Sequence, residues 1–131
     1  MSAHAASLAG RVLLVVEDEY LVAAEMVDGL ERRGATVLGP VPDVRRALAL
    51  LGRTKRLDGA LLDIQLRDEQ AYPVAEALRA RGVPFIFVSG FEQELVPEAY
   101  RGVPTCPKPL ELDAVAEALF SGRPGTLRCP G

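Results

Sequence analysis

The sequence predicts an α/β domain in which helices cover both faces of a doubly wound, five-stranded parallel sheet. Apolar runs typical of strands alternate along the chain with segments of helical periodicity. The 131 residues, 49% of them hydrophobic, are enough for one such domain with a real core and too few for two. Polar residues follow several of the apolar runs at their C-terminal ends. In an open parallel sheet these ends meet in one crevice, so the same pattern predicts a single polar pocket.

Each expected element of the first half rests on its local pattern. The first strand is a continuous run of Leu and Val, as expected for a strand buried on both faces. The following helix has apolar residues three or four positions apart and should end before Gly34. We expect Gly39-Pro40 to end the second strand and Asp43 to cap the second helix. In chain order, these elements are a strand at 11–16, a helix at 19–33, a strand at 36–38, a helix at 43–51 and a strand at 59–62.

The second half contains one element that should be irregular. Pro73 suits the first turn of the third helix. Pro97 interrupts the segment 92–100, which has few apolar positions, so we expect a short or irregular fourth helix there. The other elements are a helix at 74–81, a strand at 85–88, a short fifth strand at 103–106 and a last helix at 110–119. Residues 11–120 are therefore expected to form the domain, with flexible ends at 1–10 and 121–131.

Composition argues against several classes of protein. The net charge is −3 and the basic residues are scattered, which gives no footprint for nucleic acid. No apolar run is long enough to span a bilayer, and the N-terminus lacks the pattern of a signal peptide. The two cysteines, Cys106 and Cys129, lack the spacing of metal ligands. We therefore expect a reduced, cytoplasmic protein in which Cys106 is a small core residue.

Carboxylates follow two of the expected strands. Glu17 and Asp18 come after the first strand, and Asp63 comes after the third. If these strands are neighbours, the like charges disfavour ionisation of every member, and a divalent cation relieves that repulsion. Mg²⁺ prefers oxygen ligands of this kind. For an isolated acidic pair, the alternative is that Glu17 and Asp18 end a strand and cap the next helix.

A hydroxyl group and a lysine follow two further strands. Ser89 precedes Gly90, where the open backbone leaves room for an anion. Lys108 follows the fifth strand, and its ammonium group could neutralise a phosphoryl oxygen. Taken alone, Ser89 would be a turn former and Lys108 a solvated loop residue between two prolines. Together with the carboxylates, they predict a pocket for a divalent cation and a phosphoryl group.

Four short pieces of the sequence together resemble the receiver domain of bacterial two-component response regulators. The resemblance covers about residues 11–119 and implies the flavodoxin-like (βα)5 receiver fold. Each piece is weak alone, but the order and separations of all four are specific. The pieces are Val-Val-Glu-Asp-Glu at 15–19, Leu-Leu-Asp-Ile at 61–64, Phe-Val-Ser-Gly at 87–90 and Lys108-Pro109.

A narrower resemblance lies in the fourth expected strand. Residues 84–91 resemble the Pro-Phe-x-Phe-Ala-Thr-Gly-Tyr stretch of the FAT GUY receivers, many of which are linked to HWE-type histidine kinases. Val88, Ser89 and Phe91 replace Ala, Thr and Tyr of that pattern. The resemblance makes an HWE-type histidine kinase a candidate partner.

The resemblance implies a phosphoacceptor and a metal site. Asp63 corresponds to the aspartate that accepts the phosphoryl group. Asp18 and Asp63 correspond to direct Mg²⁺ ligands, and Glu17 corresponds to the neighbouring acid that often acts through water. Gln65 corresponds to the residue whose main-chain carbonyl binds the metal.

The resemblance also implies a switch, with one departure. Ser89 corresponds to the switch Ser/Thr and Lys108 to the family lysine, whose bond to Pro109 is expected to be cis. Receivers commonly carry an aromatic residue three positions before that lysine, where this chain has Thr105. Because Thr105 cannot make the usual aromatic swing, we expect phosphorylation to order the segment 92–100 instead.

The implied function is that of a stand-alone response regulator. It would accept a phosphoryl group on Asp63 with Mg²⁺ from a histidine kinase or phosphotransfer protein, and signal to protein partners by a conformational change. Self-phosphorylation from small donors and autodephosphorylation would take the place of conventional enzyme turnover, and a homodimer is a candidate assembly. The alternative is a pseudo-receiver that serves as a binding scaffold without phosphorylation. A flavodoxin-like cofactor binder ranks lower, because Glu17-Asp18-Glu19 would repel a phosphate without a metal. A phosphatase with an Asp nucleophile also ranks lower, because Asp63-Ile64-Gln65 lacks a second acid two residues on.

Overall fold

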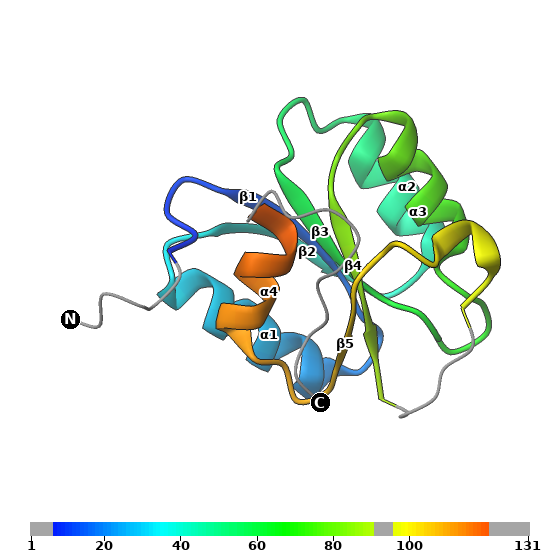
Figure 1. Cartoon of the computed structure of the whole chain (residues 1–131). Helices are drawn as coiled ribbons and strands as arrows, with labels where there is room; N and C mark the ends of the chain where they lie inside the picture. Colours follow the sequence, from blue (N-terminus) through cyan, green and yellow to red (C-terminus); the bar gives the residue numbers. More distant parts are fainter. Residues whose placement is uncertain (1–6, 91–95, 121–131) are drawn as a thin grey trace.

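The computed structural model describes residues 7–90 and 96–120, which form a five-stranded parallel sheet with helices on both faces (Figure 1). The strand order is β2-β1-β3-β4-β5. The chain therefore starts in the interior of the sheet, moves to one edge and then crosses to the other, which is the doubly wound topology that the sequence predicts. The strands are β1 (Val12–Val16), β2 (Thr36–Val41), β3 (Gly59–Asp63), β4 (Phe85–Ser89) and β5 (Thr105–Pro107).

The helices divide between the two faces of the sheet. Helices α1 and α4 cover one face and α2 and α3 cover the other, as Figure 1 shows. The core on the α1/α4 side is built mainly from Leu, Val and Ala side chains. The core on the α2/α3 side also contains aromatic rings. The helices are α1 (Tyr20–Arg32), α2 (Val44–Gly52), α3 (Tyr72–Ala80), the 3-10 turn η1 (Glu98–Tyr100) and α4 (Leu112–Phe120).

Strand β2 does not end where the sequence predicts. It continues through Gly39-Pro40 to Val41, and its register against β1 shifts between Leu14 and Val16. Gly39 has a φ of 95°, and a Cβ atom there would lie 2.8 Å from the carbonyl oxygen of Val15. Proline is tolerated because β2 is an edge strand, where a missing N–H costs no hydrogen bond to a further strand. The pair that was expected to stop the strand therefore forms an irregularity within it.

The start of α2 is tied to two other parts of the chain. The side chain of Asp43 accepts a hydrogen bond from the backbone N–H of Arg46 at 2.8 Å, which confirms the predicted cap. The side chain of Glu69 accepts a second hydrogen bond, from the backbone N–H of Val44, at 2.9 Å. Glu69 lies in the loop between β3 and α3, so this contact holds that loop against α2.

The ends of the domain differ from expectation on the N-terminal side. Leu8 has no exposed surface, and its N–H donates a hydrogen bond to the Arg33 carbonyl at 2.9 Å. The packed part of the chain therefore begins before residue 11. The remainder of the expected flexible ends, 1–6 and 121–131, lies outside the described residues.

The expected irregular helix is reduced, in its described part, to η1, which follows Pro97. Residues 92–95 of that segment lie outside the described residues. Cys106 is buried in β5 as expected, but it is disulfide-bonded rather than a reduced thiol, and its partner also lies outside the described residues. Within the described part of the chain, none of the helices combines the length and apolar character that crossing a membrane requires.

Candidate functional site

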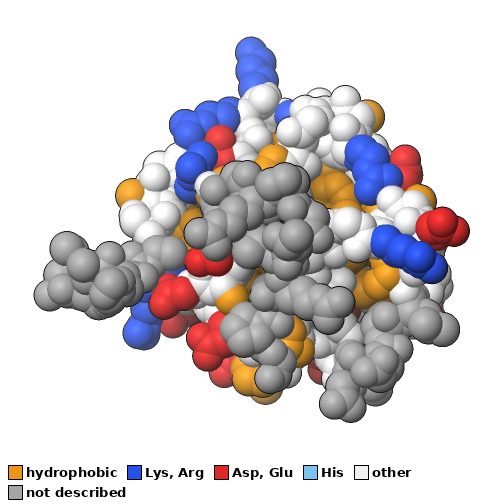
Figure 2. All heavy atoms as spheres, viewed as in Figure 1, with side chains coloured by type: hydrophobic (Ala, Val, Ile, Leu, Met, Phe, Trp, Pro, Cys, Tyr) orange, Lys and Arg blue, Asp and Glu red, His pale blue; other side chains and the backbone are white. Residues whose placement is uncertain are grey.

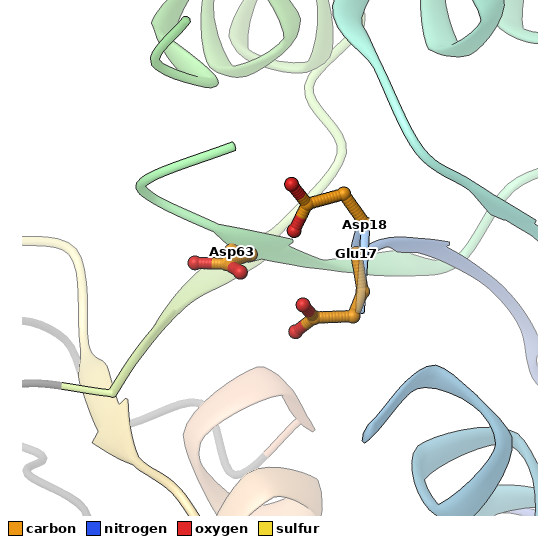
Figure 3. Close-up of side chains that lie close together, drawn as sticks. All are labelled: Glu17, Asp18 and Asp63. Carbon is orange, nitrogen blue, oxygen red and sulfur yellow. The ribbon is translucent and has the colours of Figure 1, made fainter. Parts of the chain in front are cut away.

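Three carboxylates meet at the carboxyl end of the sheet. Val16 of β1 pairs with Leu62 of β3, so the residues next after these two, Glu17 and Asp63, come out side by side. Carboxylate oxygens of Glu17, Asp18 and Asp63 lie within 4.8 Å of one another. In Figure 3, Glu17 and Asp18 leave the end of β1 on opposite sides of the strand, and both carboxylates turn toward Asp63. The structure thus brings together the acidic residues that the sequence predicted as one site.

Lys108 reaches the same point from β5. Its Nζ atom lies 3.1 Å from Oε1 of Glu17 and 3.2 Å from Oδ2 of Asp63. A third contact, at 3.4 Å, joins it to Oε1 of Glu19. The backbone N–H of Lys108 donates a hydrogen bond to the Ser89 carbonyl at 2.9 Å, so the pairing of β4 with β5 fixes where the lysine side chain begins. The Lys108-Pro109 bond is cis, as predicted.

Burial and neighbouring charges shift the pKa values of two members of this cluster. Burial is the largest effect on Glu17 and, with the hydrogen bond and charge of Asp63, raises the pKa of its carboxyl to about 7. Burial lowers the pKa of Lys108, but its hydrogen bonds and charge interactions with Glu17 and Asp63 outweigh that effect, so its pKa is raised. The carboxylates therefore hold the lysine charged, while one of them is itself hard to ionise.

The donor set fits a divalent cation. Three carboxylates with adjacent oxygen atoms offer the hard ligands that Mg²⁺ or Ca²⁺ takes. A cation there would relieve the repulsion that raises the pKa of Glu17. Gln65 is the further predicted ligand. Its backbone N–H donates a hydrogen bond to Oδ1 of Asp63 at 3.1 Å, which holds the loop beside the cluster.

A cleft of about 440 Å³ opens over the carboxylates. Asp63, Gln65 and Lys108 line it together with Gly90, which follows the buried Ser89 at the end of β4. Asp63 is 4% exposed, and it is one of the residues that line this cleft. The complete lining is Asp18, Glu19, Asp63, Gln65, Leu66, Arg67, Gly90 and Lys108.

Two charged residues of the cleft were not predicted as site residues. Glu19 contributes a fourth acid next to Lys108, and its only sequence signal was its position directly after the acidic pair. Arg67 lies four residues after Asp63 in a polar loop, where no pattern set it apart from the other surface arginines. Both carry charge, so both change the electrostatic account of the site.

Thr105, by contrast, is not among the residues that line the cleft. It begins β5 and pairs in register with Phe87. The aromatic residue near this position comes from elsewhere in the chain: Tyr100 of η1 is 5% exposed and packs against Phe87 and Tyr72. Thr105 stands at the position of the usual switch aromatic, and a part for it in the switch stays a prediction.

Basic side chains are spread over the molecule. On the face that Figure 2 shows, the lysine and arginine side chains lie apart from one another and form no continuous patch among the described residues.

The fold and the site were compared with known proteins in three ways. A scan against models of protein families finds no match, and a search of curated proteins finds none either. Among solved structures, SdrG from Sphingomonas melonis Fr1 is 42% identical, with 83% of this chain and 92% of that chain covered and a TM-score of 0.74. The chain belongs to the receiver-domain family of response regulators.

Two further structures agree with this assignment. The BeF3-activated conformation of SdrG from Pseudomonas melonis Fr1 is 41% identical, with 85% of this chain and 94% of that chain covered and a TM-score of 0.70. A CheY-like receiver domain from Methylobacillus flagellatus is 27% identical, with 85% and 96% covered and a TM-score of 0.69. The receiver domain described here therefore shares both its fold and most of its length with these proteins.

Proposed function

We propose that this receiver domain accepts a phosphoryl group on Asp63 with the help of Mg²⁺. The observation that carries the proposal is the meeting of Asp63 with two further carboxylates and Lys108 in one open cleft. An aspartate among other acids can serve as a nucleophile when cations neutralise the phosphoryl oxygens that approach it.

Each residue has a role in this proposal. Asp18, Asp63 and the main-chain carbonyl of Gln65 would hold Mg²⁺, with Glu17 acting through water, and the ion would supply charge neutralisation. A carboxylate oxygen of Asp63 would attack phosphorus in line, forming an acyl phosphate while the bond to the donor nitrogen or oxygen breaks. Lys108 lies 3.2 Å from Asp63 and would contact a phosphoryl oxygen of the product.

Ser89 is the proposed switch. It is 3% exposed and ends β4 beside β3, where Asp63 pairs in register with Val88. Its hydroxyl group would donate to a phosphoryl oxygen once Asp63 is modified. The backbone change at Ser89 would then pass to the segment 92–100. It would not pass to a switch aromatic, because this chain has Thr105 at that position.

The proposed donor is a histidine kinase or a phosphotransfer protein, because receiver domains generally interact with these proteins. The FAT GUY pattern at 84–91 favours an HWE-type kinase. The similarity to SdrG, for which a BeF3-activated conformation is known, supports a domain that responds at its site. A stand-alone regulator in the cytoplasm that acts on protein partners is the form of the protein that we propose.

The test is the intact mass after incubation with Mg²⁺ and a small phosphodonor. We expect one added phosphoryl group on the wild type and none on Asp63→Asn. Asp28→Asn is the matched control, since it removes an exposed carboxylate that pairs with Arg32 on α1. If the wild type gains no mass and also shows no Mg²⁺ binding by titration, the proposal fails and the pseudo-receiver reading replaces it.

A further inference from the structure

Arg67 stands at the tip of a small hairpin that borders the cleft. Gln65 and Gln70 pair in an antiparallel bridge, and the N–H of Leu66 donates to the Glu69 carbonyl at 2.9 Å. Leu66 is 2% exposed, so it fixes its neighbour Arg67 to the core although the arginine side chain is itself exposed. The loop that carries Arg67 is therefore held in place by its own backbone hydrogen bond and by the burial of Leu66.

Two of the acids beside this hairpin are already engaged. Arg67 also lines a second cavity, of about 300 Å³, together with the acids Asp18, Asp43, Asp68 and Glu69. Asp43 caps α2 through the N–H of Arg46, and Glu69 accepts from the N–H of Val44. Among the ion pairs of the described residues, none includes Arg67. The guanidinium group thus remains available to an anion in the cleft.

The charge of the cleft leaves a place for a second cationic side chain. With all four acids ionised, Lys108 and one divalent cation leave one negative charge uncompensated. Lys108 is held by three of those acids at 3.1–3.4 Å. Arg67 is the other cationic residue among the described residues that line the cleft. An approaching phosphoryl anion would meet net repulsion without it.

We propose that Arg67 binds the phosphoryl oxygens of an anionic phosphodonor and positions it for attack by Asp63. This inference rests on the proposed function. The planar guanidinium group can donate two parallel hydrogen bonds to phosphoryl oxygens, which a lysine cannot. In the reaction with acetyl phosphate, the bond from Asp63 to phosphorus forms while the acyl oxygen–phosphorus bond breaks, and acetate leaves with the electron pair. Arg67 transfers no proton; it supplies charge and orientation.

The experiment measures the rate of phosphorylation of the full chain by intact mass, at fixed Mg²⁺ and increasing acetyl phosphate. For Arg67→Gln we expect the second-order rate constant to fall about fivefold or more, equivalent to the loss of one good charge-assisted contact. The rate constant of Arg67→Lys should lie between those of wild type and Arg67→Gln, because lysine keeps the positive charge but cannot donate two parallel hydrogen bonds. With phosphoramidate, a donor that carries less negative charge, the rate constant of Arg67→Gln should fall by a smaller factor.

Two controls separate a donor contact from other effects. Arg32→Gln makes the same change of net charge at a side chain that is 77% exposed on α1, and it should leave the rate unchanged. The Mg²⁺ dissociation constant of Arg67→Gln should stay the same or fall, since a nearby positive charge has been removed. A merely structural role for Arg67 would instead weaken Mg²⁺ binding.

The outcomes separate this inference from the proposed function. If Arg67→Gln reacts as fast as wild type while Asp63→Asn does not react, the inference is wrong and phosphorylation of Asp63 stands. If Arg32→Gln loses as much rate as Arg67→Gln, the effect is one of net charge and the inference is again wrong. If the wild type neither reacts nor binds Mg²⁺, the proposed function has failed before this test applies.

Discussion

The acidic cleft and the aromatic cluster beside it are organised on opposite principles. In the cleft, like charges crowd together, and the pKa of Glu17 is raised to about 7. In the aromatic cluster, which we define as Tyr72, Phe85, Phe87 and Tyr100, the rings meet in favourable geometry. Tyr72 stacks on Tyr100 with centroids 5.1 Å apart, and Phe87 meets each of these two rings edge to face.

Strand β4 connects these two regions. Side chains two positions apart point to the same face of a strand, so Phe87 and Ser89 project from the same side of β4. Phe87 lies in the aromatic cluster, and Ser89 ends the strand at the cleft. The comparison shows a division of roles: the aromatic cluster stabilises β4, while the cleft at the carboxyl end of the sheet holds like charges that are unfavourable for folding.

The largest expected effect is on stability, from Phe87→Ala. Phe87 is fully buried and contacts three other rings, so its removal leaves a cavity at the centre of the aromatic cluster. We expect a loss of about 3–5 kcal/mol in the free energy of unfolding, measured by urea denaturation. Phe87→Leu, which keeps much of the volume, should lose clearly less. Equal losses for both variants would show that the ring contacts contribute little.

A change in the cleft should have the opposite sign. In metal-free protein, Glu17→Gln removes a buried carboxylate that repels Asp63, and we expect it to raise the free energy of unfolding by about 1–3 kcal/mol at pH 8. Because folding raises the pKa of Glu17, its contribution to stability is fully present below pH 4.5 and is lost as the pH rises through about 7. The gain should therefore vanish at acid pH.

Mg²⁺ provides the control for that variant. Saturating Mg²⁺ should stabilise the wild type more than Glu17→Gln, because the ion removes the same repulsion that the substitution removes. Thermal unfolding in EDTA and in Mg²⁺, at pH 4 and pH 8, gives all four comparisons. A variant that is less stable than wild type in EDTA at pH 8 would mean that the contact between Lys108 and Glu17 outweighs the repulsion.

The cleft was the easier region to predict from the sequence. A residue that directly follows a buried strand has its position set by the sheet, so Glu17, Asp63 and Ser89 could be placed at one edge from the apolar runs alone. Lys108 followed in the same way from a weaker run. The cap at Asp43 rested on an equally local rule. These predictions needed no knowledge of how side chains from distant elements pack.

The aromatic cluster was harder, because its members come from three separate elements. Nothing in the spacing of Tyr72, Phe87 and Tyr100 says that a tyrosine from η1 would fill the space between α3 and β4. The course of β2 through Gly39-Pro40 depended on its place at the edge of the sheet. The position of Arg67 at the cleft depended on a hairpin whose bridge joins two glutamines, and such a sequence does not predict strand pairing. Each of these features is decided by tertiary contacts.

The smallest expected effect comes from the hydroxyl group of Tyr100. It donates a hydrogen bond to Glu76, and Arg79 stacks on its ring at 4.7 Å and donates to the Ala99 carbonyl at 3.0 Å. Tyr100→Phe keeps the ring contacts and loses one hydrogen bond to a partly exposed acid, so we expect a loss of about 0.5–1.5 kcal/mol at pH 7.

The pH dependence of Tyr100→Phe makes this prediction specific to the hydroxyl group. Burial, with the hydrogen bond and charge of Glu76, raises the pKa of Tyr100 to about 12 from its ordinary value of 10. The stability that this shift contributes is present below pH 10 and is lost as the pH rises through about 12. Urea unfolding at pH 7, 10 and 11.5 should therefore show the gap between wild type and Tyr100→Phe closing at high pH. A gap that stays constant would mean that the hydroxyl group ionises equally in the folded and unfolded chain, and that the hydrogen bond to Glu76 is not the source of the gap.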